Sequence, residues 1–194
     1  MVNMQQMLPA MTALLSLAQL CVSQDVLGVV TFIEGALSAG DGQRLQSVAY
    51  DGQCLDNDGS ISLDKYMGLY PCAETGGASQ YMRYGETNIF FQSGAFTLCL
   101  NDWGDSTVHG APCDWGDDSG NTQFFFSADP AGELKEPFNV PYFRVHSVRG
   151  GTDYCLSARQ EAVSGSLSRF ANMLNCDGNA DQLWWVAASG FQAT

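Results

Sequence analysis

Residues 54–82 read CLDNDGSISLDKYMGLYPCAETGGASQYM and contain, in order, a Cys-Leu pair, a second cysteine, and a glutamine leading into aromatic or apolar residues. The same order recurs twice further along the chain. The later copies are Cys99-Leu100, Cys113, Gln123-Phe124-Phe125 and Cys155-Leu156, Cys176, Gln182-Leu183-Trp184. A fixed order recurring at roughly 40 to 60 residues is typical of a tandem supersecondary unit. We therefore predict three structural repeats, at about 43–88, 89–130 and 140–188.

Short runs rich in β-branched and aromatic residues lie between the cysteines, and clusters of Gly, Asp, Asn and Ser separate them. Asn88 to Leu100 and Val140 to Val148 are examples. Such runs, bounded by turn residues, are typical of β-strands. Three copies of a four-strand unit can close around a pseudo-threefold axis and leave no exposed sheet edge. The predicted fold is all-β, a β-trefoil of three Cys/Gln-x-aromatic repeats occupying residues 43–190.

The first 23 residues carry no charged side chain, contain an apolar run from about Leu8 to Val22, and end at the small residue Ser23. This pattern predicts a secretory signal peptide over residues 1–23, and hence a secreted, extracellular protein. A membrane anchor is the alternative, because no Lys or Arg precedes the run, although a spanning helix needs about 20 apolar residues. Residues 24–42 then form an N-terminal extension. Its apolar run at 26–33 predicts an extra strand, with a propeptide as the alternative.

Removal of Cys21 with the signal peptide leaves six cysteines, one pair in each repeat. Six cysteines can pair in many ways, and the repeat selects the sequential pairs. The predicted disulfides are Cys54–Cys72, Cys99–Cys113 and Cys155–Cys176. Each would close a loop of roughly 15 to 20 residues and stabilise the fold by about 3 kcal/mol in the chain-entropy model. Free thiols are the alternative. No Cys-x-x-Cys occurs and the two histidines stand apart, so we predict no metal and no cofactor.

The order Cys-Leu-Asp, aromatic-Pro-Cys and Gln-x-aromatic resembles the ricin B-type β-trefoil lectins over roughly residues 43–187. The most specific elements are Cys54-Leu55-Asp56, Tyr70-Pro71-Cys72 and Asp181-Gln182-Leu183-Trp184. Met82 and Phe125 stand where the family prefers tryptophan. Both are large and apolar, so the resemblance implies a shared core role. The glutamine beside this core anchor can satisfy backbone groups of the turn.

In this family each sugar site lies within one repeat, and the resemblance implies an aspartate after Cys-Leu, an aromatic residue before the second cysteine, and polar amides nearby. A carboxylate can accept hydrogen bonds from neighbouring sugar hydroxyls, and an aromatic ring can cover the C–H face of a pyranose. Repeat one matches best, which assigns carbohydrate binding to Asp56, Tyr70 and Ser79. Gly68 and Ser79 replace a family glutamine and asparagine. The alternative is that Asp56 caps a turn and Tyr70 packs on the disulfide.

The other repeats depart further from the family pattern. Repeat two has Asn101 and Ala111 at the two site positions, and repeat three has Ser157 and Leu174. Neither pair can both stack on a sugar and supply a charge. Near-identical Asp-Trp-Gly-Asp segments at 102–105 and 114–117 admit three interpretations: an unorthodox glycan platform, a calcium loop, or a solvated acidic turn with half-buried tryptophans.

The net charge of −13 disfavours nucleic acid and anionic polysaccharides, and it favours neutral glycans or glycoproteins, or basic proteins, as partners. No nucleophile elbow, metalloprotease motif or phosphate loop occurs, so we predict that the chain is not an enzyme. No membrane insertion is expected after signal cleavage. The predicted function is a secreted, lectin-like carbohydrate-binding protein. The alternative is a secreted β-trefoil with a protein-contact role, such as an inhibitor, toxin or coat component.

Overall fold

A computed structural model of the chain describes residues 27–38, 42–73, 77–93, 96–113, 115, 119–136, 138–162 and 167–187. The predicted signal peptide, and with it the membrane-anchor alternative, lies outside these residues. Within the described ranges, none of the helices combines the length and the apolar character that a membrane crossing requires.

Twelve of the strands fall into three successive groups of four. The first group is β1 (Arg44–Ser47), β2 (Gln53–Asp56), β3 (Gly68–Pro71) and β4 (Met82–Gly85). The second is β5 (Asn88–Ser93), β6 (Phe96–Asp102), β7 (Val108–Ala111) and β8 (Phe124–Ala128). The third is β11 (Phe143–Ser147), β12 (Tyr154–Glu161), β13 (Arg169–Asn175) and β14 (Trp184–Ala187). The predicted all-β trefoil architecture is confirmed.

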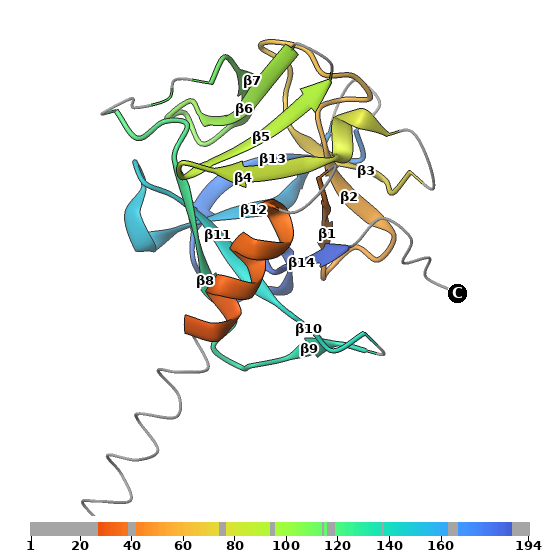
Figure 1. Cartoon of the computed structure of the whole chain (residues 1–194), viewed down its shortest axis with the longest axis vertical. Helices are drawn as coiled ribbons and strands as arrows, with labels where there is room; N and C mark the ends of the chain where they lie inside the picture. Colours follow the sequence, from red (N-terminus) through yellow and green to blue (C-terminus); the bar gives the residue numbers. More distant parts are fainter. Residues whose placement is uncertain are drawn as a thin grey trace, which may run out of the picture.

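The groups pair with one another as well as internally. One curled sheet has the strand order β12-β13-β3-β2-β1-β14-β11-β8, and a second has the order β4-β5-β6-β7 (Figure 1). β14 pairs antiparallel with β1, so the last repeat hydrogen-bonds to the first. β13 pairs with β3, and this joins the hairpins of repeats three and one. The chain therefore closes on itself through contacts that no single repeat can make.

A short hairpin, β9 (Leu134–Lys135) and β10 (Val140–Pro141), lies between repeats two and three. Val140 packs with Trp185 and Ala187 in a small apolar cluster separate from the main core. Short 3-10 turns η2 (Ala78–Gln80), η3 (Gly151–Asp153) and η4 (Ala180–Gln182) lie between the strands. Two of them, η2 and η4, carry the repeated glutamine.

The predicted disulfides Cys54–Cys72, Cys99–Cys113 and Cys155–Cys176 are confirmed, with Cα–Cα distances of 5.0, 4.9 and 5.1 Å. The glutamines of repeats one and three hold the turns beside these bridges. Gln80 accepts a hydrogen bond from the Ala73 N–H and donates one to the Pro71 carbonyl, at 2.8 and 2.9 Å. Gln182 does the same with Asp177 and Asn175, at 3.0 and 2.7 Å. The amide thus satisfies the backbone on both sides of the second cysteine, as the sequence predicts.

The main core contains Met82 and Trp184, as predicted, but not Phe125. Phe125 is half-buried and stacks on His146, with ring centroids 4.8 Å apart. Phe124 is fully buried in its place. The strand register explains why the buried position moves by one residue. Ser147 of β11 pairs with Phe124 of β8, just as Ser47 of β1 pairs with Trp184 of β14. In repeat two the core aromatic therefore follows its glutamine directly.

Residues 27–38 form a helix, so the predicted extra strand is wrong (orange in Figure 1). Ile33 and Leu37 are fully buried in the main core and Val29 packs against it. These residues recur every four positions, which is helical spacing. Ser38 Oγ donates a hydrogen bond to the Tyr84 carbonyl at 2.9 Å. This hydrogen bond places the end of the helix against β4. Burial and the nearby Glu34 carboxylate raise the pKa of Tyr84 to about 12.

His146 is buried beside the third disulfide, with Nδ1 3.9 Å from the sulfurs of Cys155 and Cys176. Its Nδ1 lies 2.9 Å from the Tyr154 carbonyl and its Nε2 lies 2.7 Å from Ser127 Oγ. A neutral ring that donates from Nδ1 and accepts at Nε2 satisfies both contacts. The two sulfurs are joined to each other, so this cluster is a disulfide with a neighbouring imidazole.

We expect acidification from pH 7 toward 5.5 to destabilise the fold through His146. Burial, opposed by the hydrogen bond to Tyr154, lowers the pKa of His146 below its usual value. The unfolded state then binds more protons below about pH 6.5, so stability falls as pH falls, by at most about 1.4 kcal/mol per pH unit for one proton. Urea titrations at several pH values should show a flatter dependence in His146→Gln. Equal slopes in both proteins would contradict this assignment.

Candidate functional site

In repeat one, Asp56 and Ser79 lie in contact, as the predicted site requires. Ser79 Oγ donates a hydrogen bond to Asp56 Oδ2 at 3.1 Å, and the Gly59 N–H donates to Asp56 Oδ1 at 2.5 Å. Asp58 and Gly59 have positive φ angles of 49° and 74°, so the carboxylate caps a tight turn. Only 1% of the Asp56 surface is exposed. The geometry therefore gives Asp56 a turn-capping contact whether or not a sugar binds.

Tyr70 lies on the same face of the β2–β3 hairpin as Asp56, opposite Cys54 in the register, and it is half-buried. Gly68 lies opposite Asp56. A Cβ at Gly68 would stand 2.0 Å from the Arg169 carbonyl oxygen and 2.8 Å from Leu167 Cδ1. The third repeat thus crosses where the family glutamine would extend, and a side chain at position 68 has no room.

Repeat three has a hydrogen bond in the place of the Asp56–Ser79 bond of repeat one. Its donor and acceptor are exchanged, because serine follows Cys-Leu and aspartate precedes the glutamine. Ser157 Oγ donates to Asp181 Oδ2 at 2.5 Å. Arg159 Nε also contacts Asp181 Oδ2, at 3.0 Å, and Arg159 Nη2 contacts Asp177 at 2.7 Å. The Arg159 guanidinium holds the pKa of Asp177 below its usual range.

The position that Tyr70 occupies in repeat one holds no aromatic residue in repeats two and three. Ala111 lies opposite Cys99 and Leu174 lies opposite Cys155, the register place that Tyr70 takes opposite Cys54. Asn101 follows Cys99-Leu100 in β6 and is partly exposed. Repeats two and three therefore place no aromatic ring at the position of Tyr70.

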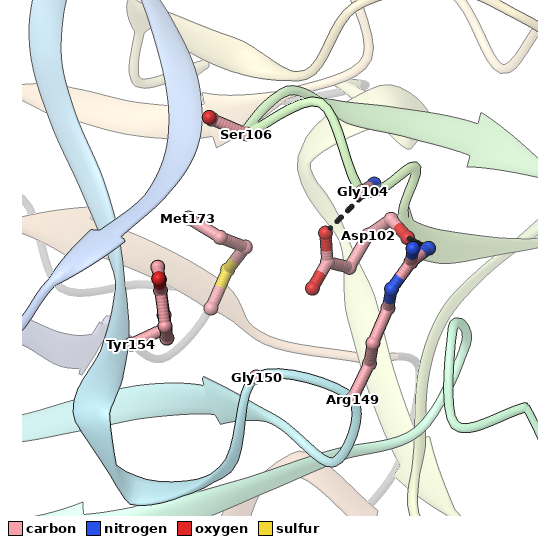
Figure 2. A pocket seen from close by; sticks show the side chains of 7 residues that line it. All are labelled: Asp102, Gly104, Ser106, Arg149, Gly150, Tyr154 and Met173. Atoms are coloured by element: carbon pink, nitrogen blue, oxygen red, sulfur yellow. Dashed lines mark hydrogen bonds between the residues drawn. The ribbon is translucent and has the colours of Figure 1, made fainter.

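A pocket of about 270 Å³ lies between repeats two and three, outside the predicted sites. Figure 2 shows its lining residues around an open centre, with Tyr154 and Met173 on one side and Asp102 and Arg149 facing them. Gly104 and Ser106 of the β6–β7 loop and Gly150 of the β11–β12 turn complete the lining.

The polar side of the pocket is held by hydrogen bonds between the repeats. Asp102 accepts from the Gly104 N–H at 3.1 Å and from Ser147 Oγ at 2.6 Å. Arg149 Nη1 donates to Asn121 Oδ1 at 3.0 Å and lies 3.5 Å from the Asp102 carbonyl oxygen. Gly104 has a φ of +88°, and a Cβ there would lie 2.3 Å from the guanidinium. Glycine at this position lets Arg149 lie flat against the loop.

The apolar side consists of an exposed ring and a buried thioether. Tyr154 is 42% exposed, whereas Met173 is buried and its N–H donates to the Ser106 carbonyl at 2.8 Å. An exposed ring facing a carboxylate and a guanidinium can accommodate a ligand with one C–H face and a hydroxylated rim. In the sequence, the acidic Asp102-Trp103-Gly104-Asp105 segment was the feature that indicated a possible glycan-binding surface here. Tyr154 and Arg149 gave no signal, because the site lies across two repeats.

No family model matches the chain, and no curated protein matches it. Solved structures do match. The designed three-fold symmetric protein ThreeFoil has 17% identity and a TM-score of 0.54, covering 75% of this chain and 97% of that one. The β-trefoil lectin of the Vibrio vulnificus hemolysin/cytolysin, solved with N-acetyl-D-lactosamine bound, has 16% identity and a TM-score of 0.54, covering 80% and 100%.

The cytolethal distending toxin from Actinobacillus actinomycetemcomitans has 17% identity and a TM-score of 0.52, covering 79% of this chain and 95% of that chain. At these identities the similarity shows the fold alone. The chain therefore has a β-trefoil fold, which a lectin and toxins share.

Proposed function

We propose that this chain is a secreted carbohydrate-binding protein, related to the ricin B-type lectins, that recognises neutral glycans. The observation that carries the proposal is the pocket between repeats two and three, where the exposed Tyr154 ring faces Asp102 and Arg149. The net charge of −13 makes anionic ligands unfavourable. The structural similarity to a lectin solved with N-acetyl-D-lactosamine bound supports the same ligand class.

Asp56, Tyr70 and Ser79 of repeat one belong to the proposal as a second site, the one that the sequence predicts. There the half-buried Tyr70 ring is the accessible part, and the Asp56–Ser79 hydrogen bond fixes the carboxylate. Tyr70→Ala therefore tests this site separately from the pocket.

We propose binding without catalysis. Glycosidases generally use a pair of carboxyl groups that flank the bond to be cleaved. Among the described residues that line the pocket, Asp102 is the one with a carboxyl group. Incubation with the glycans that bind should release no shorter sugar.

A glycan array probed with the oxidised chain from residue 24 to 194 tests the proposal. The array should carry neutral, sialylated and sulfated glycans, and we expect binding to a neutral class. Tyr154→Ala should weaken it about tenfold, which corresponds to about 1.4 kcal/mol. Leu134→Ala is the control, because Leu134 is comparably exposed but lies on the β9–β10 hairpin, away from the pocket lining.

The protein-contact alternative predicts a different result. A folded, fully oxidised protein that binds no glycan on the array would contradict carbohydrate binding. The acidic surface would then direct the search toward basic protein partners. Loss of binding in Tyr70→Ala but not in Tyr154→Ala would keep the function and move the site to repeat one.

A further inference from the structure

Four aromatic rings form a row on the protein surface. Trp103 lies 5.4 Å from His109, His109 lies 4.5 Å from Tyr66, and Tyr66 lies 4.9 Å from Phe170, measured between ring centroids. Trp103 is 54% exposed and Tyr66 is 45% exposed, whereas His109 and Phe170 are half-buried. A contiguous group of exposed apolar side chains on a protein surface often marks a ligand-binding or interaction site.

All three repeats contribute to this aromatic row. Tyr66 precedes β3, Trp103 begins the β6–β7 loop, His109 lies in β7, and Phe170 belongs to β13. Backbone bridges join Tyr66 to His109 and Thr107 to Asn172, and β13 pairs with β3. The row therefore lies where the hairpins of the three repeats meet, and the closed trefoil fixes the spacing of its rings.

The aromatic row adjoins the pocket through the β6–β7 loop, residues 103–107. Gly104 and Ser106 line the pocket, and Trp103 of the same loop begins the row. The Trp103 N–H donates to the Thr107 carbonyl at 3.3 Å, and Thr107 Oγ1 lies 2.7 Å from His109 Nε2. The pocket and the row are thus two parts of one surface supported by the same loop.

We infer that the pocket and the aromatic row form one extended site for a neutral oligosaccharide of several residues, in which Trp103 and Tyr66 each stack on a sugar beyond the one in the pocket. This inference rests on the proposed function. Aromatic rings cover the C–H faces of pyranoses, and exposed carboxylates accept their hydroxyls. Asp64 and Asp105 are exposed beside the row. The core of a protein–protein interface is depleted of charged residues, whereas exposed carboxylates adjoin this row.

Titration calorimetry with ladders of neutral oligosaccharides tests the inference. The ladders should contain one to six residues of glucose, mannose, galactose or N-acetylglucosamine. For the ladder that binds, we expect affinity to rise with length by roughly tenfold for each additional ring engaged, equivalent to about 1.4 kcal/mol. Trp103→Ala should remove about tenfold from the longer members and leave the shortest member unchanged, whereas Tyr154→Ala should weaken every length.

Trp115→Ala is the matched control, because Trp115 is comparably exposed at 46% but packs its edge against Phe90 instead of the row. Long oligosaccharides should also protect wild-type fluorescence from acrylamide quenching, and this protection should be lost in Trp103→Ala. Equal affinity at all lengths, or equal weakening of short and long members by Trp103→Ala, would overturn the extended site alone. Failure of every ladder to bind would overturn the proposed function together with it.

Discussion

Leu37→Ala should lower the free energy of unfolding by about 3 kcal/mol, the usual cost of truncating a fully buried leucine. Leu37 and Ile33 project from helix 27–38 into the main core and have no exposed surface. Alanine has a high helix propensity, so the helix itself should remain. The loss of stability then measures the cavity left in the core and the apolar contacts removed. Urea denaturation of the oxidised protein measures it, with the disulfides intact in both states.

Leu27→Ala is the matched control for this prediction, since it makes the same change in the same helix at a position that is 69% exposed. Its effect should stay within about 0.5 kcal/mol. Similar effects of the two substitutions would mean that the helix does not pack in solution as described, and the propeptide alternative for residues 24–42 would then be favoured. A large difference would make this segment a part of the folded domain.

Trp184→Ala should have a comparable or larger effect, a loss of about 4 kcal/mol. Among the described residues, Trp184 is the largest fully buried side chain, and its Nε1–H donates to the Leu156 carbonyl at 3.0 Å. Alanine removes both the packing of the indole and the partner of a buried carbonyl. An unpaired buried carbonyl costs about 1 to 3 kcal/mol.

Trp184→Phe separates these two contributions. Phenylalanine retains much of the apolar volume but cannot donate to Leu156, so its cost should be smaller than that of alanine. Trp103→Ala removes an exposed indole and serves as the stability control. Thermal unfolding and urea titration should agree on the order alanine, phenylalanine, wild type. Equal stability of Trp184→Ala and Trp103→Ala would contradict the assignment of Trp184 as a core anchor.

The repeat made much of the fold predictable. Because the order of cysteines and glutamine recurs, it identified the three units, selected the disulfide pairs and gave Gln80 and Gln182 their turn-holding role. These features are local to one repeat, so each copy supplies independent evidence for the others.

Two predictions about the fold were wrong, the extra strand in the N-terminal extension and the core role of Phe125. Both rested on local patterns that tertiary contacts override. In the segment 26–33, β-branched residues favoured a strand, while the spacing of Val29, Ile33 and Leu37 was helical and is what the structure follows. In repeat two, the three consecutive phenylalanines 124–126 left the buried position ambiguous by one residue. The pairing of β8 with β11 decides it, and that pairing is not visible in the sequence.

The candidate pocket was less predictable for a topological reason. Its residues come from the end of β6, the β6–β7 loop, the turn before η3 and strands β12 and β13, so they meet only after the repeats close on one another. A search within each repeat cannot assemble them. The acidic tryptophan segment at 102–105 indicated one wall. The ring of Tyr154 on the other wall lies about 50 residues further along the chain, next to Cys155 of the third disulfide.

The hydrogen bonds Asp56–Ser79 and Ser157–Asp181 occupy matching places in repeats one and three with their two members exchanged. The two repeats differ at both positions, yet each holds one carboxylate bonded to one hydroxyl. In these two repeats the residue at one position therefore constrains the residue at the other. Asp56→Ser combined with Ser79→Asp should be tolerated better than either change alone, because the double variant restores the carboxylate–hydroxyl pair that each single change breaks.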